Sequence, residues 1–192
     1  MADVQEKFYT AEDLWELSHQ LDDVQYELFE GELYEMSPTG ERHGEISIEF
    51  GSIIRNHVKA NKLGRVTAAE TGYILFKNPD PQGKDTVLAP DVGFISKERA
   101  ATKAATGFVN GAPDLAIEVV SPSDHYGKIA KKVELYLRYG TRMVLIVDAD
   151  EQTIVRHSPE GTKIFGIDDV LDFGDVLPNF TIRVRDIFEE TE

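Results

Sequence analysis

The longest regular pattern of apolar residues in this chain lies between positions 41 and 61. Here Ile46, Phe50 and Ile53 recur with the period of about 3.6 residues that an amphipathic helix requires. The pattern predicts a long helix over residues 41–61 that buries one face. Shorter helices are predicted over AEDLWELSHQL, after the N-cap residue Thr10, and over KIAKKVELYLRYG, after Ser123 or Asp124.

Strand-like segments separate these helices. YELFEGELYEMSP predicts two short strands around Glu30-Gly31, and PEG predicts the turn of a later hairpin in TIVRHSPEGTKIFGI. The nearly continuous apolar runs of DLAIEVVS and RMVLIVDAD favour strands covered on both faces, joined by the intervening helix as a crossover. Further strands are predicted in RVTAAETGYILFK, TVLAPDVGFIS and LPNFTIRVRDIFEE. This order predicts an α/β fold: a mixed β-sheet flanked by helices, with added hairpins.

Composition narrows the class of protein. The chain has 192 residues, 41% hydrophobic and 29% charged, which favours one globular domain over residues 1–192. It contains no cysteine, so disulfides and thiolate metal sites are excluded. The N-terminus has no apolar signal segment, and no apolar run approaches the roughly 18 residues of a membrane helix. We therefore expect a cytoplasmic protein without a membrane partner.

The formal net charge of −15 argues against a general nucleic-acid binder, which normally uses clustered Lys and Arg. Exposed charges are largely screened beyond about 8 Å, and a bound divalent cation reverses the local sign of a site. The charge therefore weighs against extensive contacts with a polyanion but leaves a local metal site open.

Two acidic residues in strand-like segments are the main candidates for chemistry. Asp91 follows Pro90 in APDVGFI, and Glu118 interrupts the apolar run of LAIEVV. Alternation of side chains places Glu118 on the same face as Ala116 and Val120. An unpaired buried carboxylate is strongly unfavourable, so a cation must compensate it. Mg²⁺ commonly binds one or two carboxylates, with water and phosphate oxygens completing its shell, so Asp91 and Glu118 are predicted as metal ligands.

Candidate partners lie on the two flanking helices. Helical spacing places Lys132 beside the buried face of its helix, so we predict it as the cation of the site, with Lys128 one turn away as second candidate. Glu49 and His43 lie beside the apolar stripe of the long helix and are predicted to approach the same cleft. The five candidate catalytic residues are Asp91, Glu118, Lys132, Glu49 and His43.

Each candidate also has a purely structural interpretation. Asp91 would cap backbone N–H groups near a turn, and Glu118 would form a salt bridge with Lys132 or Lys128 that fastens helix to sheet. Such roles predict no metal. The other histidines lack the spacing of zinc ligands.

Several ordered motifs resemble the Uma-two family of restriction endonucleases, within the PD-(D/E)XK nuclease superfamily. They are YELFEGELYEMSP, a histidine opening a helix (His43), APDVGFI, LAIEVVSPSD, KVELY with a following glycine, and a strand ending in Asp148; together they span roughly residues 9–188. The resemblance implies a restriction-endonuclease-like fold with Asp91 and Glu118 as metal ligands. In the superfamily a lysine stands two residues after the second acid, but here Val120 occupies that position. The resemblance implies that Lys132, on the following helix, replaces it.

We therefore predict a Mg²⁺- or Mn²⁺-dependent endonuclease that hydrolyses DNA phosphodiesters. Cutting both strands of DNA would favour a homodimer. Two alternatives stay open. One is a non-catalytic acidic interaction module on the same fold, which the net charge favours. The other is a metal-dependent phosphohydrolase of small nucleotides.

Overall fold

A computed structural model describes residues 7–20, 24–80, 83–100, 107–120 and 124–189. Its larger sheet has six strands in the order β11-β10-β9-β8-β6-β3, so β8 lies near the centre. Strands β8 and β9 are parallel, and every other neighbouring pair is antiparallel. The strands are β3 (Gly64–Ala68), β6 (Val92–Ser96), β8 (Leu115–Val120), β9 (Met143–Asp148), β10 (Thr153–Ser158) and β11 (Gly161–Phe165). This confirms the predicted mixed sheet with a buried strand over LAIEVV.

A second sheet has five strands in the order β2-β1-β5-β4-β7. They are β1 (Gln25–Phe29), β2 (Glu32–Met36), β4 (Tyr73–Phe76), β5 (Thr86–Leu88) and β7 (Val109–Asn110). The β1–β2 hairpin turns at Glu30 and Gly31, both with positive φ, as a two-residue hairpin turn requires. A small pair, β12 (Val170–Asp172) and β13 (Thr181–Arg183), completes the described strands.

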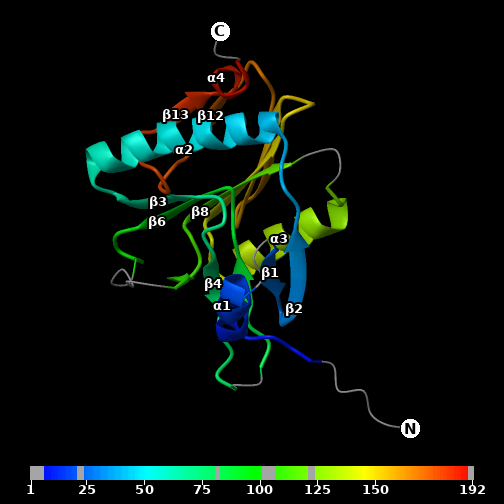
Figure 1. Cartoon of the computed structure of the whole chain (residues 1–192). Helices are drawn as coiled ribbons and strands as arrows, with labels where there is room; N and C mark the ends of the chain where they lie inside the picture. The colour runs from blue at the N-terminus through cyan, green and yellow to red at the C-terminus, as the bar shows by residue number, and fades with distance from the viewer. Residues whose placement is uncertain (1–6, 21–23, 81–82, 101–106, 121–123, 190–192) are drawn as a thin grey trace.

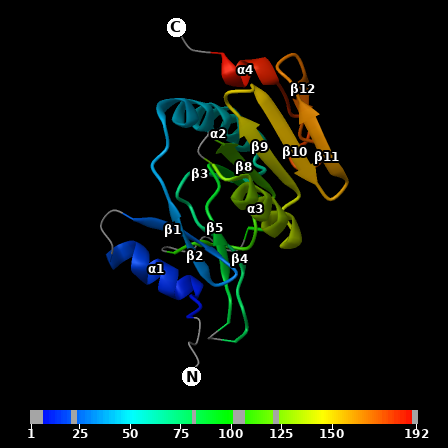
Figure 2. The same ribbon diagram turned by 90° about the vertical axis from the view of Figure 1, so that its right-hand side faces the viewer.

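Helices cover both faces of the six-stranded sheet (Figures 1 and 2). The long helix α2 (Glu41–Asn61) has the predicted bounds and buries Ile46 and Phe50 in the same core as Ile117 and Val119 of β8. Helix α3 (Tyr126–Arg138) packs on the other face, where its Tyr136 shares a core with Ala116 of β8. The two other described helices are α1 (Ala11–Gln20), against β1, and α4 (Val184–Phe188), against α2. None of these helices is long and apolar enough to cross a membrane.

The segment TVLAPDVGFIS, predicted as strand without a division between sheets, forms two strands that belong to different sheets. β5 ends at Leu88 and β6 begins at Val92, so residues 89–91 carry the chain from the small sheet to the large one. Pro90 explains the break, because it donates no backbone hydrogen bond to a strand. Asp91 therefore lies at the junction of the two sheets.

Candidate active site

Asp91 is held at this junction by its neighbours. Its Oδ2 accepts a hydrogen bond from the backbone N–H of Val119 in β8 at 2.7 Å, and lies 3.2 Å from Nε2 of His43 in the first turn of α2. Both side chains are largely buried, with 15% of Asp91 and 11% of His43 exposed. The carboxylate is thus fixed next to the strand that carries Glu118.

Glu118 projects from β8 toward α3, as the alternation of side chains predicts. Its Oε2 lies 2.6 Å from Nζ of Lys132, and its Oε1 accepts a hydrogen bond from the hydroxyl of Tyr136 at 2.8 Å. Residues 132 and 136 are one turn apart, so both reach the same carboxylate from one face of the helix. The ion pair that a structural role predicts is therefore present.

A third carboxylate, which sequence reasoning missed, belongs to this cluster. Glu27 of β1 is 1% exposed, and its Oε1 lies 2.9 Å from Nζ of Lys132. The same oxygen accepts a hydrogen bond from the backbone N–H of Ala89 at 3.0 Å, and Oε2 lies 3.8 Å from Nζ of Lys128. Two buried carboxylates therefore face one buried ammonium. A structural ion pair needs only one carboxylate, so the cluster holds more carboxyl groups than one lysine requires.

This charge distribution shifts the pKa values of the cluster. Burial, together with the charges of Glu27 and Asp91, raises the pKa of Glu118 to about 8 despite the ammonium of Lys132. Burial opposes the charge of Lys132, but Glu118 and Glu27 outweigh it and raise the lysine pKa. The hydrogen bond to Asp91 raises the pKa of His43, against the effect of burial. The raised pKa of Lys132 keeps it a cation near neutral pH, whereas the raised pKa of Glu118 favours its protonated form there.

These groups line one pocket of about 520 Å³ between the two sheets. Asp91, Glu118, Lys132, His43 and Glu27 all contribute to its wall. Lys128, Asp124 and His125 also line it. The structure thus brings together four of the five predicted site residues and adds Glu27.

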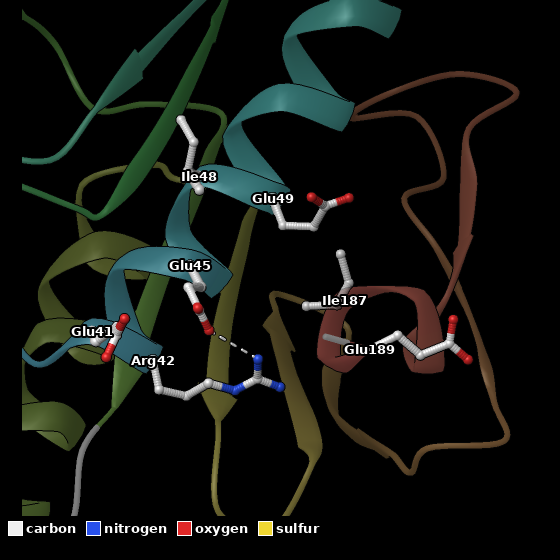
Figure 3. Close-up of a pocket in the computed structure, with 7 residues that line it drawn as sticks. All are labelled: Glu41, Arg42, Glu45, Ile48, Glu49, Ile187 and Glu189. Carbon is white, nitrogen blue, oxygen red and sulfur yellow. Dashed lines mark hydrogen bonds and ion pairs between the residues drawn. The ribbon is translucent and has the colours of Figure 1, made fainter. Parts of the chain in front are cut away.

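Glu49 is the exception, and the expectation that it approaches this pocket is wrong. It lies in a separate acidic pocket with Glu41, Glu45 and Glu189, between α2 and α4 (Figure 3). At about 100° per residue, six residues separate Glu49 from His43 by about 120° around the helix, so they face different directions. Glu45, one turn away, shares the direction of Glu49.

Glu27 was missed because its burial depends on contacts distant in sequence. The β1–β2 hairpin carries the glutamates 27, 30, 32 and 35, and local pattern does not distinguish the one that faces a lysine 105 positions later. The one local signal is that Glu27 lies between Tyr26 and Leu28 in a strand-like segment.

The donor set fits a hard divalent cation. Among the residues that the structure describes, no group of three or more His, Cys, Asp or Glu side chains could hold a metal ion. Mg²⁺ does not need such a group, because waters and substrate phosphate complete a shell that begins with one or two carboxylates. Asp91 and Glu118 supply two carboxylates in the same pocket, and Asp91 is near enough to raise the pKa of Glu118.

Comparison with known proteins assigns the family. The model of the Uma2 family, described as putative restriction endonucleases, matches residues 11–185. The chain belongs to the Uma2 family. Among solved structures, it is similar to that of a putative nuclease belonging to DUF820 from Anabaena variabilis, with a TM-score of 0.76 and 23% identity over 94% of this chain and 97% of that chain. This likeness confirms the restriction-endonuclease-like fold of the Uma2 chain. No curated protein matches it.

Proposed function

We propose that this Uma2 protein is a Mg²⁺- or Mn²⁺-dependent endonuclease that hydrolyses phosphodiester bonds of DNA. The observation that carries the proposal is that Asp91 and Glu118 line one pocket, with Lys132 bonded to Glu118. Membership in a family described as restriction endonucleases supports the same reaction class.

Asp91 and Glu118 would hold the cation. When bound, the ion supplies a water of lowered pKa and neutralises charge on the phosphate. In hydrolysis a water oxygen forms a new bond to phosphorus, the bond to one sugar oxygen breaks, and the departing oxygen gains a proton. Lys132 would orient the attacking water or stabilise the phosphate, because its raised pKa keeps it a cation. His43 would position Asp91 by donating to Oδ2.

Calorimetric titration with Mn²⁺ tests the metal site. The parent should bind saturably, and Asp91→Ala and Glu118→Ala should abolish binding. Glu49→Ala is the matched control, since this glutamate lines another pocket and should leave the affinity unchanged. Equal Mn²⁺ affinity in the parent and both site variants would contradict the proposal. Cleavage of plasmid and oligonucleotide DNA with Mg²⁺, compared with turnover of free nucleotides, separates an endonuclease from a small-nucleotide phosphohydrolase.

The net charge of −15 favours one competing function, a non-catalytic acidic interaction module. For that module the buried ion pair would be replaceable by apolar residues. The triple variant Glu27→Leu/Glu118→Leu/Lys132→Met, which leaves neither carboxylate of the cluster buried without Lys132, should then keep or gain stability, with no nuclease activity in the parent to lose. For the nuclease, the same variant loses activity whatever its stability.

A further inference from the structure

A second cavity, of about 440 Å³, adjoins the candidate active site. Residues 36–39, His43 and Asp91 line both cavities, so they form a common wall. Beyond this wall the second cavity is lined by Gln25, by Gly44, Ser47, Ile48 and Gly51 of α2, and by residues 68–70 at and just after the end of β3. We call it the α2 groove. Anything bound at Asp91 has direct access to it.

The α2 groove differs from the candidate active site in charge. Lys128 and Lys132 line the active-site pocket, whereas no Lys or Arg among the described residues lines the groove. Besides the shared His43 and Asp91, Glu70 is the one ionisable residue in the described part of its lining. A phosphate would meet carboxylates without a compensating lysine there. The groove is therefore suited to an uncharged part of a ligand whose phosphate lies beside Asp91.

Two glycines of α2 expose helix backbone to the groove. Gly44 and Gly51 are seven residues apart, about 20° around the helix, and so share one face. Glycine inside a helix costs about 0.5–1 kcal/mol relative to alanine. A Cβ at position 44 would meet no atom within 4 Å, so packing within the protein does not require this glycine. Ser47 donates its hydroxyl to the carbonyl of His43 at 2.7 Å, so this hydroxyl is satisfied within the helix.

We propose that the α2 groove receives the sugar and base of a nucleotide adjoining the scissile phosphate, with that base unpaired. The inference rests on the proposed nuclease function and specifies its substrate class: single-stranded or locally unpaired DNA. A paired base would bring the second strand's phosphates toward the protein. The adjacent turns of α2 carry Glu41, Glu45 and Glu49, and the chain as a whole is strongly acidic. A single strand that places only its sugar and base in the groove keeps a second set of phosphates away from these carboxylates.

Filling the groove tests the inference. Gly44→Phe places a ring over the bare backbone, and its matched control is Gly127→Phe in α3, another exposed glycine whose Cβ would meet nothing within 4 Å. The probe is a short fluorescent single-stranded oligonucleotide of mixed sequence in Ca²⁺ buffer, compared with the same sequence as a duplex. We expect the parent to prefer the single strand. Gly44→Phe should weaken its binding about tenfold, or ~1.4 kcal/mol, while Gly127→Phe should leave it unchanged.

Mn²⁺ calorimetry keeps this inference separate from the nuclease proposal. Gly44→Phe should bind Mn²⁺ like the parent, because the groove supplies no ligand beyond the shared Asp91. If Mn²⁺ binding did not depend on Asp91 and Glu118, the nuclease proposal itself would be overturned. The groove inference is overturned if Gly44→Phe binds the single strand as tightly as Gly127→Phe, if the parent prefers duplex, or if the parent binds no single strand. Should Gly44→Phe unfold more readily than the parent, Gly44→Leu takes its place.

Discussion

Glu27 and Glu118 hold the same ammonium group, with Nζ of Lys132 lying 2.9 Å from Oε1 of Glu27 and 2.6 Å from Oε2 of Glu118. The two glutamates belong to β1 of the small sheet and β8 of the large one. Lys132 therefore joins the sheets as well as serving the pocket, and its removal has consequences for stability.

Lys132→Met should lower the free energy of unfolding by about 3–5 kcal/mol, because it leaves buried carboxylates without their cation. Lys131→Met is the matched control on the same helix. Lys131 pairs with Glu30 and Glu134 at the surface, where an ion pair contributes about 0–1 kcal/mol. Urea unfolding monitored by circular dichroism measures both variants. Equal losses in the two would show that the buried cluster adds no stability.

Replacing Glu118 should change how stability depends on pH. The pKa of Glu118 is raised from 4.5 to about 8, so between these values the native state keeps a proton that the unfolded chain has released. The free energy of unfolding therefore falls as pH rises through this window. Glu118→Gln removes this dependence, and we expect its pH profile to be flatter by roughly 3–4 kcal/mol between pH 5 and 8.

Urea titrations of the parent and Glu118→Gln at several pH values make this comparison. His43, whose pKa is also raised, contributes a fall in the same direction above its ordinary value of 6.5. It is present in both proteins, so the difference between the profiles reports Glu118. Parallel profiles would mean that the carboxyl ionises normally in the native state.

Asp91→Asn should lower the pKa of His43. The hydrogen bond to the Asp91 carboxylate is the largest cause of the raised pKa, whereas burial acts in the opposite direction. Asparagine keeps an oxygen to accept the N–H of Val119 but loses the charge, so burial should then dominate. Titration of the imidazole signals by NMR measures the change. His157, whose pKa burial lowers, is the internal control and should not move.

Binding of Mn²⁺ should strengthen as pH rises toward 8. A carboxyl must lose its proton to bind a cation, and Glu118 holds its proton near neutral pH. Below pH 8 the apparent affinity should rise about tenfold per pH unit, with a proton released on binding. Calorimetry in buffers of different ionisation enthalpy counts that proton. An affinity that is constant from pH 6 to 8 would exclude Glu118 as a titrating ligand.

The sequence pattern predicted those features that depend on geometry within a single helix or strand. The apolar period around Phe50 gave α2 with its observed bounds, and alternation along β8 gave the face of Glu118. Helical spacing also identified Lys132 as the lysine on the buried face, which its contact with Glu118 bears out. These features depend on geometry within one element, which the sequence specifies directly.

Contacts between elements were not predictable in the same way. Nothing in TVLAPDVGFIS states that Val87 and Phe94 belong to different sheets, because strand pairing depends on distant partners. The burial of Glu27 has the same origin, since it depends on how the small sheet packs against α3. Glu49 was misplaced because polar residues border the apolar stripe of α2 on both sides. Only the fold decides which of these sides meets the pocket.

The corner at Ala89, Pro90 and Asp91 makes the small sheet a structural part of the pocket. The backbone N–H of Ala89 is held by Glu27, and Asp91 is held by Val119. A shortened chain that began at α2 would retain both proposed metal ligands and the six-stranded sheet. It would nevertheless lose Glu27, leaving Ala89 unanchored and Lys132 with half of its carboxylates. A minimal fragment that keeps this pocket intact therefore has to include the β1–β2 hairpin.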